Sequence, residues 1–120
     1  MSIAAHIVIA LVALLHIWFL VLEMFLWDKP AGRRAFGTTA EFAAQSKVLA
    51  ANQGLYNGFL AAGLVWGLVA DDPTAFAAKV FFLVCVVVAG LYGAATANRR
   101  ILVAQALPGA VALAAVLLAR

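Results

Sequence analysis

The chain has 120 residues, of which 68% are hydrophobic and 11% are charged, and its formal net charge is +3. A soluble domain carries roughly 25% charged residues, and a chain this short cannot bury so much apolar surface in a water-facing fold. The composition therefore excludes an ordinary soluble domain and predicts one transmembrane domain over residues 1–120, with the lipid bilayer as its main partner.

Long apolar segments dominate the sequence, and a membrane-spanning helix needs roughly 20 such residues. We expect an all-α fold, a polytopic four-helix transmembrane bundle, with spans at about 3–27, 48–70, 76–98 and 101–119. The first segment is too long for a secretory signal and lacks its basic start and its cleavage site, so we expect it to be retained.

The connection at 28–47, which we expect to be cytoplasmic, is the only long one. Pro30 and Gly32 are interpreted as turn signals. Thr38 and Glu41 then have the spacing of a capping box, which predicts that a helix starts there and runs towards or into the second span.

The other two connections are short. In the second, an acidic residue precedes Pro73, a pattern typical of a helix start. The third, at 98–100, is so short that the last two spans must form a tight antiparallel pair.

The orientation follows from the basic residues, which gather on the cytoplasmic side of membrane proteins. Lys79 and Arg120 fall on one side of the predicted bundle. The others fall in the first and third connections: Lys29, Arg33, Arg34, Lys47, Arg99 and Arg100. This bias predicts that both termini are periplasmic or external and that the protein lies in the bacterial inner membrane. The basic residues form no face with interleaved aromatics, so we expect no nucleic-acid partner.

Polar side chains inside the spans collect at the cytoplasmic level and are the candidates for a binding or proton-linked site. They are Glu23, His16, Asn52, Gln53, Asn57, Tyr92 and Gln105. Glu23 is the only acidic residue in any span, and intramembrane carboxylates are costly groups that usually serve a function. Three states of Glu23 remain open: a neutral proton donor, an anion held by cations or amides, and a group that reaches water or only joins helices.

His16 precedes Glu23 by seven residues, about 10.5 Å along a helix, so the two side chains cannot touch. His16 is either hydrogen-bonded inside the bundle or a ligand, for example to haem. Gln53 and Asn57 share one helix face, and Asn52 shares another with Tyr56. Such amides either bind a carboxyl or substrate hydroxyl or join helices.

The sequence has no HExxH, CxxC, P-loop or GxGxxG motif, and Cys85 is the only cysteine. We therefore expect no metal site and no resident cofactor, the haem alternative for His16 aside. Small residues repeat at four-residue spacing, which favours close helix packing within one chain or between copies. They are Gly54 with Gly58, Gly63 with Gly67, and Ala89 with Gly93 and Ala97. Four helices enclose little volume, so we expect a homo-oligomer.

Three stretches carry a family resemblance: HIWFLVLEMFLW at 16–27, KVLAANQGLYNGFLAAGL at 47–64 and AGLYGAAT at 89–96. With them the chain resembles the bacterial domain-of-unknown-function family 1304, small membrane proteins of about this length. The resemblance implies a four-helix membrane protein with Glu23, Asn52, Gln53 and Asn57 at motif positions. It implies no particular activity.

Three functions compete. In the first, an oligomer binds or translocates a small-molecule ligand, with Glu23 as a proton-linked or cation-linked gate. In the second, a membrane enzyme acts on a lipophilic substrate, with Glu23 as acid or base or with haem on His16. In the third, the protein is a structural or accessory subunit and its polar layer only holds the helices together.

Overall fold

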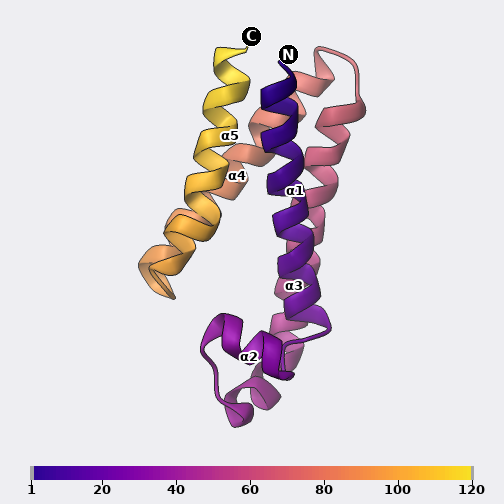
Figure 1. The fold of residues 1–120 in the computed structure, drawn as a ribbon. Coiled ribbons are helices and arrows are strands. Elements are labelled where there is room, and N and C mark those ends of the chain that lie inside the picture. Colours follow the sequence, from indigo (N-terminus) through magenta and orange to yellow (C-terminus); the bar gives the residue numbers. More distant parts are fainter. Residues whose placement is uncertain (1, 120) are drawn as a thin grey trace. The chain divides into compact units, whose positions relative to one another are not determined.

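The computed structural model describes residues 2–119, and every regular element in that range is a helix (Figure 1). In chain order the elements are α1 (Ile3–Met24), α2 (Pro30–Phe36), α3 (Ala40–Val69), α4 (Thr74–Thr96), the π-helical segment η1 (Leu102–Ala106) and α5 (Leu107–Leu118). The predicted all-α class is confirmed.

Two of these helices, α1 and α4, are long and apolar enough to cross a membrane. The C-terminal helical segment Leu102–Leu118 is apolar but shorter. Helix α3 has ample length, but it is less apolar than α1 and α4 because its middle carries amides and glycines. Hydropathy and length therefore single out two spanning candidates among the described helices.

The chain divides into two compact units. The connection unit is Leu14–Ala61, and the hairpin unit holds the residues up to Ala13 and from Ala62 onward. Helices α1 and α3 each contribute residues to both units.

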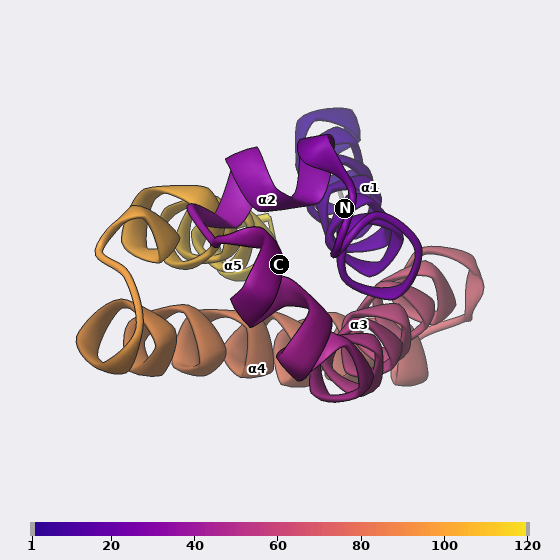
Figure 2. The same ribbon diagram turned by 90° about the horizontal axis from the view of Figure 1, so that it is seen from below.

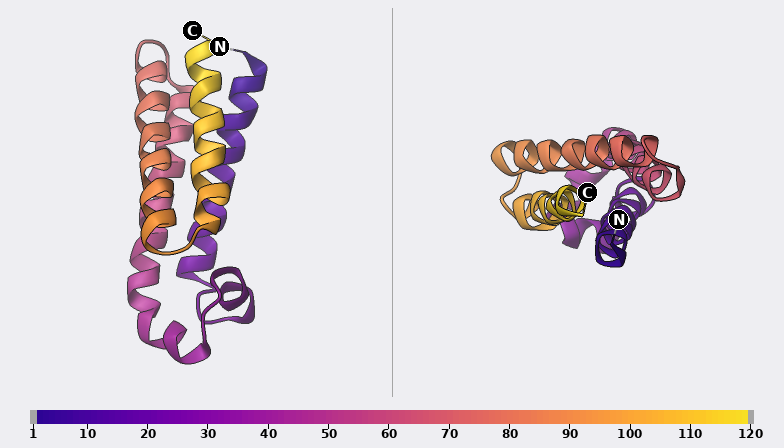
Figure 3. Two further views of the ribbon diagram at one scale, coloured as in Figure 1. Left: turned by 90° about the vertical axis from the view of Figure 1, so that its left-hand side faces the viewer. Right: turned by 90° about the horizontal axis from the view of Figure 1, so that it is seen from above.

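In the hairpin unit, α4 and the segment formed by η1 and α5 run antiparallel and side by side (Figure 3). A Cβ added at Gly90 of α4 would lie 2.6 Å from the backbone nitrogen of Ala106, and one at Gly109 would lie 2.7 Å from Val86 Cγ1. Glycine at both positions lets the two backbones approach closely. The predicted tight antiparallel pair is confirmed.

Of the small residues predicted to favour close packing on α4, not all pack within the chain, and packing between copies stays a prediction. Ala89 and Ala97 are exposed, although Gly93 does contact Ile101. The buried face instead follows Val86 and Gly90. Because α4 is apolar on all sides, its sequence alone does not distinguish the packed face from the exposed one.

The C-terminal span is predicted as one uniform helix, but its first part is π-helical. The amide of Leu107 bonds to the carbonyl of Leu102, five residues back. Pro108 follows directly, and proline has no N–H with which to continue an α-helical ladder. A local change of hydrogen-bonding pattern is the usual response of a helix to such a residue.

In the connection unit, α1 ends at Met24, three residues before the predicted boundary, and a further helix, α2, follows (Figure 2). The interpretation of Pro30 as a turn signal is wrong. Pro30 begins α2, because its fixed φ suits the first helical position. Gly32 is buried, and a Cβ there would lie 2.0 Å from the carbonyl oxygen of Leu26. The segment ends at Gly37, whose φ is 66°.

The predicted helix start at the capping box is shifted by one residue. The hydroxyl of Thr39, not Thr38, accepts a hydrogen bond from the Phe42 amide at 3.1 Å. Helix α3 then continues unbroken from Ala40 to Val69, which confirms that the predicted helix continues through the segment predicted as the second span. At the next helix start, Asp72 Oδ1 accepts a bond from the Phe76 amide at 3.1 Å, as its place before proline predicts.

Large apolar side chains cover the outside of both units. Leu14 and Trp18 are exposed in the connection unit, as are Phe81, Val88 and Leu91 in the hairpin unit. Exposed apolar surface on this scale indicates contact with lipid or with another protein.

Candidate functional site

Glu23 and Asn57 meet within the connection unit. Glu23 lies in the last turn of α1, and Asn57 lies near the middle of α3. The Nδ2 amide of Asn57 donates a hydrogen bond of 2.5 Å to Glu23 Oε1. Both side chains are half-buried. The pair is thus a carboxyl group and an amide joined between two largely apolar helices.

Glycines on α3 make this contact possible. A Cβ added at Gly54 would lie 2.7 Å from Met24 Cγ and 3.1 Å from Glu23 Cβ, and one at Gly58 would lie 2.8 Å from Leu20 Cδ1. The predicted role of Gly54 and Gly58 in close helix packing is confirmed. Because the helices lie this close together, the short side chain of Asn57 reaches the carboxyl group.

His16 is fully buried, two helical turns before Glu23 on α1. Its ring makes an edge-on contact with Phe19, with 5.3 Å between the ring centroids. The imidazole is thus surrounded by protein rather than exposed on the surface of α1. A packed histidine and a haem ligand are both buried, so the two interpretations of His16 stay predictions.

Of the remaining candidates, two lie in the connection unit and two lie in the hairpin unit. Asn52 and Gln53 are exposed on α3. Tyr92 is 72% exposed, and Gln105 is half-buried within the π-helical segment; both belong to the hairpin unit. A polar layer drawn from all four spans therefore stays a prediction, and the direct contact is that of Glu23 with Asn57.

Within residues 2–119, no group of three or more His, Cys, Asp or Glu side chains is placed to hold a metal ion. Cys85 is a free, half-buried thiol on α4.

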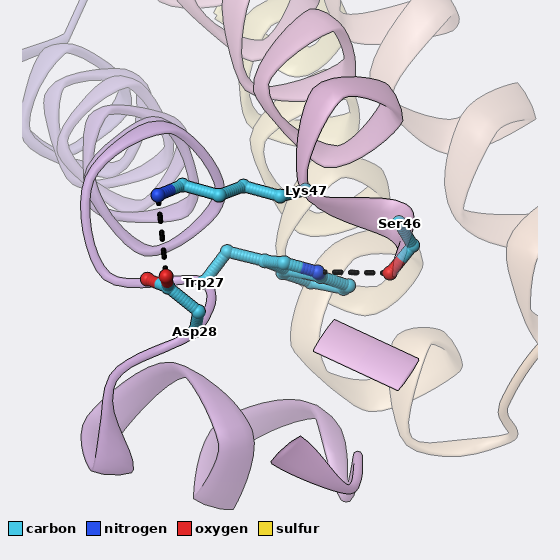
Figure 4. A network of polar contacts seen from close by, with 4 residues as sticks. All are labelled: Trp27, Asp28, Ser46 and Lys47. Carbon is cyan, nitrogen blue, oxygen red and sulfur yellow. Dashed lines mark hydrogen bonds and ion pairs between the residues drawn. The ribbon is translucent and has the colours of Figure 1, made fainter. Parts of the chain in front are cut away.

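Sequence reasoning missed a set of contacts that ties the end of α1 to the start of α3, which we call the Trp27 clasp: Trp27, Asp28, Ser46 and Lys47 (Figure 4). The indole Nε1 of Trp27 donates to Ser46 Oγ at 3.0 Å, and Lys47 Nζ lies 3.2 Å from Asp28 Oδ2. The hydrogen bond from Lys47 lowers the pKa of the Asp28 carboxyl, with further help from the positive charges of Lys47 and Lys29. The only sequence signal for these contacts was the indole of Trp27 and the carboxyl group of Asp28 at the end of an apolar segment. Their partners lie 19 residues further along the chain.

Lys79 is a second missed feature, because the sequence places it only as a topology marker. It is 5% exposed, and its stem packs on Gly67, where an added Cβ would lie 2.6 Å from Lys79 Cγ. A lysine can bury its methylene stem in this way while its ammonium group reaches towards water. The predicted packing role of Gly67 is confirmed, and the same holds for Gly63, which lies against the ring of Phe82.

Comparison with known proteins defines the family. A family model described as "Protein of unknown function (DUF1304)" matches residues 10–117. The chain belongs to the DUF1304 family. A relative in this comparison, the uncharacterized protein YpaA of Lactococcus lactis subsp. lactis (strain IL1403), is 31% identical over 107 residues, which are 88% of this chain and 89% of YpaA. No solved structure matches. The resemblance seen in the sequence is confirmed, and the DUF1304 match includes both Glu23 and Asn57.

Proposed function

We propose that this DUF1304 protein crosses the bacterial inner membrane four times and, as a homo-oligomer, binds or translocates a small solute at Glu23. The solute class that the site favours is a proton or a small cation. The observation that carries the proposal is the hydrogen bond between Asn57 Nδ2 and Glu23 Oε1, formed between two apolar helices.

A carboxyl group in such surroundings needs compensation for the loss of water. One amide donor gives partial compensation, since a carboxylate accepts several hydrogen bonds on its two oxygens. A proton or a cation supplies the rest. The site is therefore suited to bind a positive species, and to bind it more weakly when the carboxyl group is replaced by a neutral amide.

Membrane location draws support from several observations. Helices α1 and α4 have the length and hydropathy of spans, and exposed apolar side chains cover the described surface. The amides that lower the hydropathy of α3 include Asn57, which donates a hydrogen bond to Glu23. The free-energy cost of placing this amide in a membrane would therefore be offset by its role at the site. The exposed apolar faces and the exposed Asn52 and Gln53 also offer contact surface to a second copy of the chain.

The test is transport in liposomes. Purified protein is reconstituted into vesicles that contain a trapped pH-sensitive or potassium-sensitive dye, and uptake of protons and of potassium ions is measured under an imposed gradient. We expect protein-dependent flux of at least one of these cations, and we expect Glu23→Gln to reduce it by tenfold or more. The amide keeps the size and hydrogen bonding of the side chain but cannot carry the charge.

Glu41→Gln is the matched control, because it makes the same chemical change at an exposed carboxyl group at the start of α3. It should leave the flux unchanged. Flux that is indifferent to Glu23→Gln would overturn the proposal and favour an accessory role. An enzyme would instead show turnover of a lipophilic substrate that Glu23→Gln abolishes, without cation flux.

A further inference from the structure

A small basic hollow lies beside α2 in the connection unit. It has a volume of about 320 Å³ and is lined by Pro30, Arg33, Arg34 and Thr38. Small-molecule sites have volumes of roughly 300 to 1,000 Å³, so this hollow is sized for a small ligand or for one chemical group of a larger one.

The backbone explains how the hollow forms. The positive φ of Gly37 turns the chain back at the end of α2, and the amide of Thr38 bonds to the carbonyl of Arg33 at 3.1 Å. This turn brings Thr38 over the helix that carries both arginines. The ring of Pro30 completes the lining from the first turn of α2.

Two polar atoms of the hollow's lining are buried without a hydrogen-bond partner, Arg33 Nε and Thr38 Oγ1. Arg34 donates one bond, from Nε to the carbonyl of Pro30 at 3.4 Å. Within residues 2–119 no carboxylate forms an ion pair with either arginine, since the acid at the start of this connection, Asp28, is paired with Lys47. Buried polar atoms without partners cost free energy, and a shift of the Arg33 and Thr38 side chains towards a ligand with acceptor oxygens would recover it.

We propose that this hollow binds a phosphate group. Two guanidinium groups and a hydroxyl supply several donors and two positive charges, and the planar fork of arginine matches the spacing of phosphate oxygens. The lining contains no acidic side chain that would repel an anion. The site is separate from the Glu23–Asn57 pair, and phosphate binding does not depend on the transport proposed there.

The phosphate has two sources, a phospholipid headgroup and free inorganic phosphate. The surroundings suit a headgroup at a membrane surface. The rings of Trp27 and Phe36, which belong to the same connection as the hollow-forming residues, pack together at a centroid distance of 4.9 Å. Aromatic side chains of this kind concentrate at the headgroup level. Basic clusters just outside a membrane span also attract anionic lipids.

The experiment measures binding to the full-length protein in a neutral detergent by native mass spectrometry and by titration. One arm adds phosphatidylglycerol, with phosphatidylcholine as the zwitterionic comparison, and a second arm adds inorganic phosphate. We expect Arg33→Gln/Arg34→Gln to weaken binding of phosphatidylglycerol by tenfold or more. Thr38→Val, which removes only the hydroxyl donor at nearly constant shape, should weaken it about threefold.

Arg99→Gln/Arg100→Gln is the matched control, because it removes the same charge from the third connection, outside the hollow. It should change the affinity less than twofold. Binding of inorganic phosphate with the same dependence on Arg33 would assign the site to the free anion, whereas binding of the lipid alone would assign it to a headgroup. Equal losses in both double variants, or no binding in either arm, would overturn the proposal. Thr38→Val retains both charges, so it still tests the hollow if the double variant fails to fold.

Discussion

Asn57 is the residue on which the candidate site depends most directly, because its amide is bonded to Glu23 across two helices. Asn52, which lies five residues earlier on the same helix, has the same side chain but is exposed. Substitutions at Asn57 and at Asn52 can therefore be compared. The first removes the contact with Glu23, and the second removes only a polar side chain from the same helix.

Replacing Asn57 by alanine should lower the free energy of unfolding by about 1 to 3 kcal/mol, because the half-buried carboxyl group loses its amide partner. Asn52→Ala should change it by no more than roughly 0.5 kcal/mol, as is usual for exposed positions. Denaturant unfolding of the detergent-solubilised protein, followed by helicity, measures both. Equal losses in the two variants would mean that the Glu23–Asn57 bond adds nothing to stability.

The ion pair of Asp28 with Lys47 makes a prediction about pH. The pKa of Asp28 is lowered in the folded protein, chiefly by the hydrogen bond from Lys47. A carboxyl group of this kind stabilises the fold at pH values above its unfolded pKa of about 3.9, and the stabilisation is lost as the pH falls through the lower, folded value.

We therefore expect Asp28→Asn to lower the melting temperature at pH 7, and the difference from the wild type to shrink as the pH falls below about 4. The difference should also shrink in high salt, because the pair is exposed to solvent. Asp71→Asn, at an exposed acid in the α3–α4 turn, is the comparison. If the difference in melting temperature between Asp28→Asn and the wild type is the same at pH 7 and at pH 3, the ion pair is not the cause of that difference.

At the level of whole elements, Gly90 and Gly93 differ in what surrounds them on the same helix. An added Cβ at Gly90 meets backbone atoms of Ala106 at 2.6 and 2.7 Å, whereas one at Gly93 meets only the side chain of Ile101 at 3.2 Å. A backbone cannot move aside as a flexible side chain can.

Gly90→Ala should therefore destabilise the α4–α5 hairpin by about 1 to 3 kcal/mol, the usual range for overpacking. Gly93→Ala should cost less than half as much, because Ile101 can adjust. Thermal unfolding of both variants in one detergent measures the difference. If both alanines are tolerated equally, the hairpin packs more loosely than the contact of Gly90 with Ala106 indicates.

The sequence predicted elements well where a local signal was strong. Asp72 before Pro73 marked the start of α4, and the three-residue connection at 98–100 determined the antiparallel hairpin. The same local rules failed at Pro30, which is compatible with a turn and with a first helical position. What decides between them is the burial of Gly32 against Leu26, a contact that only the folded chain provides.

Two of the seven residues predicted for the site, Glu23 and Asn57, are in contact, and the sequence did not predict which side chains would pair. Glu23 and Asn57 stood out because they are costly in an apolar helix, yet their pairing depends on the rotation of α3 about its axis. Gly54 and Gly58 indicate how α3 is rotated, since they mark the face of α3 that approaches α1. Asn52 carries the same chemistry on an exposed face, and no feature of its own distinguishes it from Asn57.

For the whole molecule, the proposed membrane topology rests on the distribution of basic residues, which places six of the eight Lys and Arg side chains in the first and third connections. A strong bias of this kind fixes one orientation, whereas a weak one allows both. In the proposed function, this orientation determines the side from which the solute reaches Glu23, because it places Glu23 at the cytoplasmic end of α1.

Cysteine labelling in cells tests the orientation, in a Cys85→Ser background that removes the native thiol. Single cysteines replace Ser2, Asp71 and Ala35, all of them exposed. A membrane-impermeant maleimide should label Ser2→Cys and Asp71→Cys in cells whose inner membrane is intact, and Ala35→Cys only after that membrane is permeabilised. Labelling of Ala35→Cys in intact cells would reverse the topology, and partial labelling at all three positions would indicate insertion in both orientations. Either result would place Glu23 at the outer end of α1 in some or all molecules, and the bound solute would then enter from the periplasm.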